Sequence, residues 1–184
     1  QYAFATLTYP EKFNVLLTSV RKAYEAQLDA QGNQLSNEAW IANVNAPGYN
    51  AAYHATAKTS SYPSMLLVRN EDYDAWKDGG WIEQIKGKTV GTQSTTSGSG
   101  YVYPTMLLQE NGLKFVSGTP NAANGEVKSQ TIGGHQNSVL ALLNNEVDAV
   151  FTFLDARLHA TAYNAWIEAN PGKTPFSETK VVAL

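Results

Sequence analysis

A strand, a hydroxyl-rich turn and a helix follow one another between Lys88 and Leu108, and this stretch constrains the fold more than any other. The segment Lys88–Gln93 (KTVGTQ) alternates and contains β-branched residues, which is typical of a strand. The segment Tyr101–Leu108 (YVYPTMLL) favours a helix. A turn that joins a strand to a helix lies at the edge of the sheet in α/β proteins, so we expect the side chains of this turn at such an edge.

The turn holds five hydroxyl side chains and two glycines within seven residues. A helix N-terminus carries unpaired N–H groups and a partial positive charge, and glycines let a ligand approach the backbone closely. We therefore predict that this loop binds a tetrahedral oxyanion, a phosphate or a phosphonate group. The alternative is a solvated turn or a simple helix cap, for which Ser/Thr/Gly runs are also used. The loop residues are Ser94, Thr95, Thr96, Ser97, Gly98, Ser99 and Gly100.

Charge and composition exclude several classes of function. The 184-residue chain has a formal net charge of −3, which argues against a general nucleic-acid-binding protein, because such proteins need a basic surface. The chain has no cysteine, so thiol catalysis, disulfides and cysteine-based metal sites are excluded. His54, His135 and His159 are scattered, with no carboxylate at ligand spacing, so we expect neither a metal site nor a cofactor.

The chain has the composition of a folded protein, with 43% hydrophobic and 16% charged residues. No apolar run approaches the length of a membrane span, and no signal peptide opens the chain. The first residues are typical of the inside of a strand. We therefore expect the chain to be a mature form or a fragment.

The order of the expected elements predicts an α/β protein whose second half contains a mostly parallel sheet. A polar segment and a short helical turn ending at Gly87 indicate a lobe boundary. We therefore expect residues 1–86 to form part of a first lobe and residues 87–184 to form a second. The expected strands are 2–8, 40–44, 64–69, 88–93, 113–117, 127–132, 147–153 and 180–184; the expected helices are 13–27, 81–86, 101–108, 138–143 and 156–169, the last burying Leu158, Ala162, Trp166 and Ala169.

Three polar features follow predicted strands or begin predicted helices in the second half. They are the hydroxyl-rich loop, His135 before helix 138–143, and Asp155 just after strand 147–153. Ligands of open α/β sheets bind outside the carboxyl ends of the strands. We therefore expect these three features to converge at one edge of the sheet.

Several of these motifs together resemble one family. Ile85–Val90 (IKGKTV) leads into Ser94–Pro104 (STTSGSGYVYP), Gly134–Leu143 (GHQNSVLALL) follows, and Val147–Val150 (VDAV) begins the next strand. This succession is similar to the substrate-binding proteins of phosphate, phosphite and phosphonate ABC transporters, a group that also contains lipoproteins that bind phosphorylated vitamins such as thiamine diphosphate. The resemblance covers about residues 62–155. It implies a two-lobe, type II periplasmic-binding-protein-like fold that is incomplete in this chain.

The resemblance also implies which residues contact the ligand. Ser97, Ser99 and the backbone around Gly98 and Gly100 would bind the phosphoryl oxygens, and His135 would donate to the same oxyanion. The candidate ligand-binding residues are Ser94, Thr95, Thr96, Ser97, Gly98, Ser99, Gly100, Tyr101, His135, Asn137, Asp155, Tyr62 and Tyr49.

Several of these roles have alternatives. Asp155 would meet a cationic part of the ligand, or it would instead cap the helix that follows it. His135 would bind the anion, or it would be an N-terminal helix residue that caps its own backbone. Contacts from the first lobe would come from Tyr62, Tyr49 or Tyr53, and the motifs do not choose among them.

The expected function is that of an extracytoplasmic solute-binding protein of an ABC importer, periplasmic or lipid-anchored, which captures a phosphorylated or phosphonate small molecule by hinge closure. Its partner would be a membrane permease, and no nucleic acid is expected. One alternative is a sensory or scaffolding domain with the same fold. Another is a phosphoryl- or acyl-transfer enzyme with a loop serine as nucleophile and His135 as base, although the chain lacks the usual catalytic motifs. Inorganic phosphate, phosphite, alkylphosphonates and phosphorylated vitamins all suit the loop.

Overall fold

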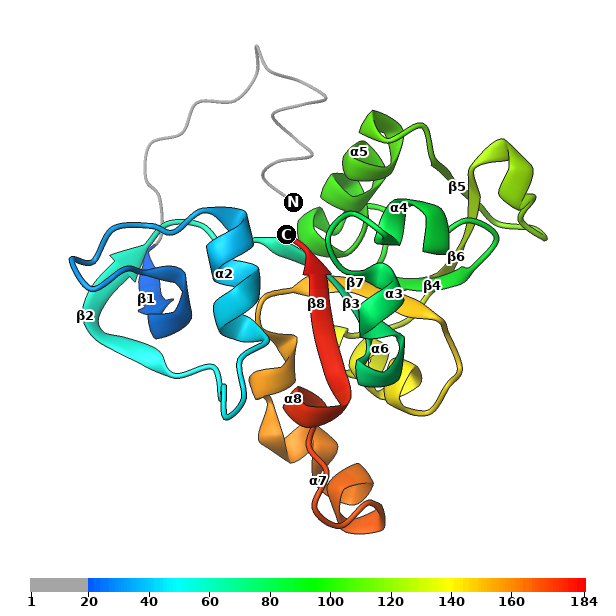
Figure 1. Cartoon of the computed structure of the whole chain (residues 1–184). Helices are drawn as coiled ribbons and strands as arrows, with labels where there is room; N and C mark the ends of the chain where they lie inside the picture. The colour runs from blue at the N-terminus through cyan, green and yellow to red at the C-terminus, as the bar shows by residue number, and fades with distance from the viewer. Residues whose placement is uncertain (1–19) are drawn as a thin grey trace.

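A computed structural model describes residues 20–184, which form a six-stranded central sheet, a separate two-stranded sheet and helices that flank them (Figure 1). The predicted strand 2–8 and the first part of the predicted helix 13–27 lie outside the described residues. In chain order the elements are β1 (Arg21–Tyr24), a 3-10 turn η2 (Glu25–Gln27), α2 (Asn37–Val44), β2 (Tyr53–Thr59), β3 (Ser64–Arg69), η3 (Asn70–Asp72), α3 (Tyr73–Trp76), α4 (Trp81–Gln84), β4 (Thr89–Thr92), a π-helical turn η4 (Gly98–Val102), α5 (Tyr103–Glu110), β5 (Lys114–Val116), η5 (Ala122–Asn124), β6 (Glu126–Thr131), α6 (His135–Leu143), β7 (Ala149–Phe153), η6 (Ala156–Leu158), α7 (Ala160–Ala169), α8 (Pro175–Glu178) and β8 (Thr179–Ala183).

The central sheet has the strand order β5-β6-β4-β7-β3-β8. The pairs β5–β6, β6–β4 and β4–β7 are parallel, whereas β3 is antiparallel to both of its neighbours. The predicted mixed α/β architecture with a mostly parallel sheet is therefore confirmed. However, the sequence predicts β3 in the lobe before residue 87, and here it is hydrogen-bonded between β7 and β8 in the sheet of the second half. The division of the chain into lobes 1–86 and 87–184 stays a prediction.

The two-stranded sheet corrects the prediction for residues 20–27. These residues form β1 and a 3-10 turn instead of the end of a helix. Strand β1 pairs antiparallel with β2, with Arg21 opposite Thr59 and Lys22 opposite Lys58. The apolar residues of this segment have helical spacing, but the segment forms a strand because β2 supplies hydrogen-bond partners from about thirty residues away. Sequence reasoning did not predict β2.

The segment 40–44 is helical, so its prediction as a strand is wrong. Helix α2 begins after Ser36, whose hydroxyl accepts a hydrogen bond from the Ala39 N–H and caps the helix. At its other end Asn45 protects the edge of the central sheet, because its side-chain amide both donates to the carbonyl of Val181 (2.7 Å) and accepts from the Val181 N–H (2.8 Å). This contact fixes α2 beside β8, the last strand of the sheet (Figure 1).

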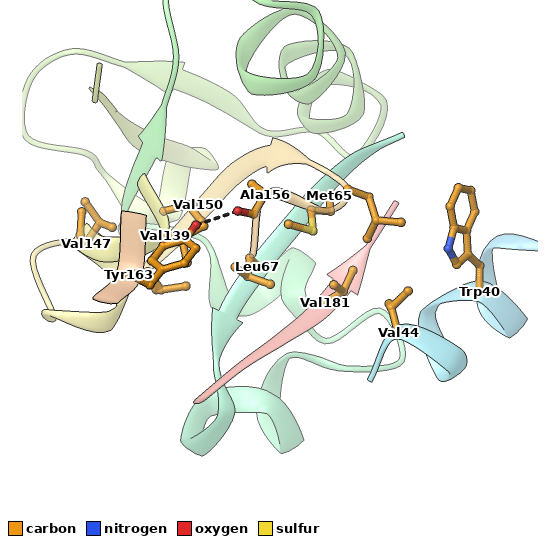
Figure 2. Close-up of a cluster of buried hydrophobic side chains, with 13 residues drawn as sticks. Trp40, Val44, Met65, Leu67, Val139, Val147, Val150, Ala156, Tyr163 and Val181 are labelled. Atoms are coloured by element: carbon orange, nitrogen blue, oxygen red, sulfur yellow. Dashed lines mark hydrogen bonds between the residues drawn. The ribbon is translucent and has the colours of Figure 1, made fainter. Parts of the chain in front are cut away.

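Apolar side chains alternate between the two faces of the central sheet and form two cores. On one face Met65 and Leu67 of β3 and Val150 of β7 pack with residues of α2, α6 and α7 (Figure 2). On the other face Leu66 and Val68 pack with residues of α3, α4 and α5. Both faces of β3 and β7 are covered, which explains their nearly continuous apolar sequences. Among residues 20–184, no helix combines the length and the apolar composition that crossing a bilayer requires.

The predicted helix 156–169 is divided into η6 and α7, with the break at His159. Of the four residues expected on its buried face, Ala162 and Ala169 are exposed. The fully buried side chain is Tyr163, whose hydroxyl donates to the carbonyl of Ala156 at 2.7 Å (Figure 2). The break rotates the second part of the helix, so a single helical period cannot describe both parts.

Candidate ligand-binding site

The hydroxyl-rich loop lies at the carboxyl edge of the central sheet, as predicted. It follows β4, and the parallel strands β6 and β7 end at the same edge. Antiparallel β3 begins there, because Ser64 is opposite Phe153, the last residue of β7. The Ser64 hydroxyl donates a 2.7 Å hydrogen bond to the carbonyl of Ser99 and so attaches the loop to β3.

The loop folds into a π-helical turn that leads into α5. The Ser97 hydroxyl accepts from the Gly100 N–H (3.3 Å), and the Ser97 carbonyl accepts from the next two N–H groups. The tip of the loop, residues 94–96, is exposed. Within residues 20–184, the N–H groups of Gly98 and Ser99 donate no hydrogen bond. The loop therefore combines unpaired N–H donors with hydroxyl groups at a helix start, which is the arrangement expected of an anion site.

Gln93 connects the loop to the start of α6. Its side-chain amide donates to the Ser138 hydroxyl (2.7 Å) and accepts from the Gly134 N–H (3.2 Å), and its backbone N–H donates to the Gly100 carbonyl (3.1 Å). Gly100 packs directly on this side chain, so that a Cβ atom at residue 100 would overlap it. Sequence reasoning did not identify Gln93, because its role depends on the distance between two segments that are forty residues apart.

His135 is the first residue of α6, and the structure brings it to the same edge as the loop. Its Nδ1 lies 2.7 Å from the hydroxyl of Thr152 on β7. That hydroxyl is fully buried, and Nδ1 is its one hydrogen-bond partner among residues 20–184. A buried hydroxyl needs an acceptor, so Thr152 donates to Nδ1 and the imidazole proton is on Nε2. His135 therefore presents a neutral N–H donor.

Burial, with a smaller effect of the neighbouring His159, lowers the pKa of His135 below its usual value. Its full contribution to stability is therefore present above the unfolded pKa of about 6.5, and it is lost as the pH falls through the folded pKa. We expect the free energy of unfolding to decrease over this range in the unmodified protein and to decrease less in His135→Gln. Urea denaturation at a series of pH values measures this. Equal pH dependence in the two proteins would contradict the assignment.

A cluster of three aromatic rings surrounds Phe153, and the ring of His135 is one of them. The rings of His135, Tyr62 and His159 all meet Phe153 edge-on, with centroid distances of 4.8, 5.9 and 6.0 Å. The guanidinium of Arg21 lies 4.2 Å above the centroid of Tyr62. Among the three tyrosines considered, Tyr62 is the one whose ring contacts Phe153, the neighbour of His135. Its side chain is 43% exposed.

The predicted ligand contact of Asp155 is not supported. Its side chain is fully buried and both carboxylate oxygens are bound by Arg157, at 2.8 Å from Nε and 2.7 Å from Nη2. It also accepts from the Arg157 N–H and caps η6, which is the alternative that the sequence left open. Among residues 20–184, Asp155 therefore holds Arg157 and the start of η6.

Tyr49 belongs to the same buried cluster. Its ring packs edge-on against Phe176 at 5.5 Å and lies 5.5 Å from the Arg157 guanidinium. Burial, together with the charge of Asp155, raises the pKa of the Tyr49 hydroxyl. The predicted role of Tyr49 in the ligand site is therefore not supported. Tyr53 instead stacks on Tyr24 at 4.7 Å.

The two remaining candidates have local roles. The ring of Tyr101 stacks on Phe115 of β5 at 5.5 Å, on the face of the sheet that α5 covers. The side chain of Asn137 donates to the carbonyl of Gly133 at 2.6 Å and stabilises the turn before α6. The loop, His135 and Tyr62 thus lie at one edge of the sheet, whereas the side chains of Asp155 and Tyr49 belong to a cluster around Arg157 beneath it.

The periplasmic substrate-binding proteins of ABC phosphonate transporters form a family whose sequence profile matches residues 18–181. The chain belongs to this family, which is a family of transport proteins and not a class of enzymes. None of the curated proteins compared with the chain matches it.

Solved structures of periplasmic binding proteins are among those similar to the chain. A Xanthomonas citri protein bound to ATP is 17% identical with a TM-score of 0.49, over 66% of this chain and 40% of that one. A binding-protein component of an ABC phosphonate transporter from Pseudomonas aeruginosa is 16% identical with a TM-score of 0.43, over 90% of this chain and 39% of that one. An ancestral arginine-binding protein bound to arginine is 21% identical with a TM-score of 0.37, over 66% and 41%. The chain spans about two fifths of the length of these proteins.

Proposed function

We propose that the chain binds a phosphonate or phosphate group as part of an extracytoplasmic solute-binding protein of an ABC importer. The observation that carries this proposal is the pairing of two donor sets at one sheet edge. The loop offers the N–H groups of Gly98 and Ser99 and its hydroxyls, and His135 offers its Nε2–H. Membership of the phosphonate-transporter family supports a ligand of this chemistry.

Neutral donors are sufficient for such a ligand. A hydrogen bond to a charged group contributes about 1.5–3 kcal/mol, and four or five of them support micromolar affinity after the entropic cost of association. A neutral site also binds and releases its ligand without burying an uncompensated protein charge. This suits a protein that must release its ligand to a permease.

Closure of a second lobe would complete the site. The loop tip at residues 94–96 is exposed, so one side of a bound anion would still face solvent in the part of the chain described here. Hinge motion between two lobes would cover that side and create the surface that a permease recognises. A sensory domain would use the same ligand site. Uptake of the ligand into cells that depends on a permease would distinguish a transport protein from a sensory domain.

The geometry does not favour the enzyme alternative. A nucleophilic serine requires a hydrogen bond to its general base. His135 directs Nδ1 to Thr152, and none of its hydrogen bonds to residues 20–184 involves a loop serine. We therefore propose binding without turnover.

The test of this function is Ser99→Ala. The Ser99 hydroxyl forms no hydrogen bond with residues 20–184, so its removal should leave the fold intact. We expect binding of methylphosphonate, measured by isothermal titration calorimetry, to weaken by at least about tenfold because one charge-assisted hydrogen bond is lost. Ser117→Ala, an exposed serine that follows β5, is the matched control and should bind normally. Unchanged affinity in Ser99→Ala would remove the loop from the site, and no binding of methylphosphonate or phosphate by the unmodified chain would refute the ligand class.

A further inference from the structure

The pair formed by Thr152 and His135 connects the core of the sheet to the proposed anion site. Thr152 lies on β7 with no exposed surface, and its hydroxyl is 2.7 Å from Nδ1 of His135. The imidazole also packs edge-on against Phe153, the next residue of β7, at 4.8 Å. Nε2 forms no hydrogen bond with residues 20–184, so β7 fixes the ring through Nδ1 and leaves Nε2 available.

The residue before His135 is attached to the hydroxyl-rich loop. The side chain of Gln93 accepts from the N–H of Gly134 at 3.2 Å, while its backbone N–H donates to the carbonyl of Gly100 at 3.1 Å. A single residue therefore links the start of α6 to the loop.

The residue after Thr152 is attached to the loop as well. Phe153 is opposite Ser64 in the sheet, and the Ser64 hydroxyl donates to the carbonyl of Ser99 at 2.7 Å. Both members of the pair are thus neighbours of residues that contact the loop directly or through one hydrogen-bonded side chain.

The Thr152 hydroxyl suits one protonation state of His135. With Nδ1 unprotonated, the hydroxyl donates to it. If Nδ1 carries a proton, in the cation or in the other neutral tautomer, the ring must donate instead, and the hydroxyl proton then has no acceptor among residues 20–184. A buried donor without an acceptor is unfavourable, and a hydrogen bond to the neutral form of a group opposes its ionisation.

The charged groups around α6 do not reverse this preference. Burial and, to a smaller extent, His159 lower the pKa of His135, and the ring of His159 meets Phe153 at 6.0 Å. Strands β4 and β7 and the loop contain no ionisable side chain. Within residues 20–184, the other ionisable side chains on elements packed against α6 form no hydrogen bond or ion pair with His135. They are Arg69, Asp155, Arg157, Tyr163, Glu168 and Glu178.

We propose that Thr152 is a positioning residue of the anion site, which fixes the proton of His135 on Nε2 and keeps the imidazole neutral, so that a phosphonate or phosphate group meets a neutral N–H donor instead of a cation. This inference rests on the proposed function, because it requires Nε2 to face the anion. A free imidazole titrates near pH 6.5. Thr152 therefore prevents the charge of the site, and with it the affinity, from changing in this range.

The first measurement is nitrogen NMR of the imidazoles in the isotope-labelled full chain, which shows which ring nitrogen carries the proton and where the ring titrates. We expect the proton of His135 on Nε2 alone in the unmodified protein. Thr152→Val removes the hydroxyl and keeps the shape of the side chain, so both neutral tautomers should be present and the pKa of His135 should rise. Thr152→Ser keeps the hydroxyl and should retain the Nε2–H form.

The second measurement is isothermal titration calorimetry with methylphosphonate. Near pH 8, Thr152→Val should bind about two- to threefold more weakly than the unmodified protein, because only the fraction with the proton on Nε2 can donate. Near pH 5.5 the released imidazole is protonated and its charged N–H binds an anion more strongly, so the ratio should reverse. Protonation of methylphosphonate cancels in this ratio, since both proteins bind the same ligand.

Two controls make the result specific. Thr179→Val makes the same change at another fully buried hydroxyl, at the opposite edge of the sheet, and should leave the affinity unchanged at both pH values. In His135→Gln, adding Thr152→Val should change the affinity by less than about twofold at either pH, because Thr152 acts through His135.

The outcomes separate the two proposals. A proton on Nδ1 in the unmodified protein, an unchanged tautomer and titration in Thr152→Val, or a ratio of affinities that does not vary with pH overturns the role of Thr152, while binding of methylphosphonate still supports the proposed function. If no folded protein of the series binds methylphosphonate or phosphate, both proposals are overturned. A ratio that reverses with pH in Thr152→Val and not in Thr152→Ser or Thr179→Val supports both.

Discussion

We expect Asp155→Ala to lower the free energy of unfolding by about 3–5 kcal/mol, because it leaves a buried charge without its partner. The Arg157 guanidinium is 0% exposed and forms its two short hydrogen bonds with Asp155. Its other hydrogen bonds within residues 20–184, to the carbonyls of Val44 and Thr179, are longer, at 3.4 Å each. These carbonyls belong to α2 and β8, so the ion pair connects three parts of the fold. Urea denaturation monitored by circular dichroism measures the loss.

Two further variants make this prediction specific. Asp74→Ala removes an acid whose side chain is 90% exposed and whose one ion pair within residues 20–184 is with Lys77 on the surface, so we expect no measurable loss of stability. The double variant Asp155→Leu/Arg157→Met replaces the whole pair by apolar groups, and it should be more stable than Asp155→Ala alone. If the double variant is less stable than Asp155→Ala, the loss in Asp155→Ala comes from the missing attraction within the ion pair and not from leaving the buried charge of Arg157 unpaired.

Sequence reasoning predicted the elements whose burial produces a continuous run of mostly apolar residues. Strands β3 and β7 are covered on both faces and consist mostly of apolar residues, so the segments 64–69 and 147–153 identified them. Helix α2 was missed although Ser36 provides a capping hydroxyl and Trp40 and Val44 have helical spacing. Strand β1 could not be found in this way, because it depends on pairing with the distant and largely exposed β2.

The candidate site shows the same division. The position of the hydroxyl-rich loop and His135 at one edge of the sheet could be predicted because both follow predicted strands in an α/β order, while their contact with a ligand stays a prediction. Asp155 satisfied the same rule, but sequence does not reveal that its side chain is buried and paired with Arg157, which leaves its predicted ligand contact without support. The contact between Arg21 and Tyr62 was not predicted either, since it depends on a sheet that the sequence did not predict.

Gly100→Ala should have the second large effect, on the loop itself. A Cβ atom at residue 100 would overlap Cγ of Gln93 and lie 2.7 Å from its Cβ. Gln93 has no room to withdraw, because its amide is held by Ser138 and Gly134. We expect the free energy of unfolding to fall by about 1–3 kcal/mol from overpacking. We also expect methylphosphonate affinity to fall by at least about tenfold, because the displaced loop loses its aligned donors. Urea denaturation and calorimetry measure the two effects.

Gly98→Ala is the matched control for stability, since it adds the same methyl group two residues earlier. There the nearest atoms are ring carbons of Tyr103 at 3.4 and 3.8 Å, an ordinary contact, so the fold should keep its stability. Equal destabilisation by both alanines would attribute the loss to the stiffness of the loop and not to Gln93. Adding Gln93→Ala to Gly100→Ala separates packing from hydrogen bonding. The smaller side chain removes the overlap and should restore part of the stability, but it cannot restore binding, because the connection between the loop and α6 is lost with the amide.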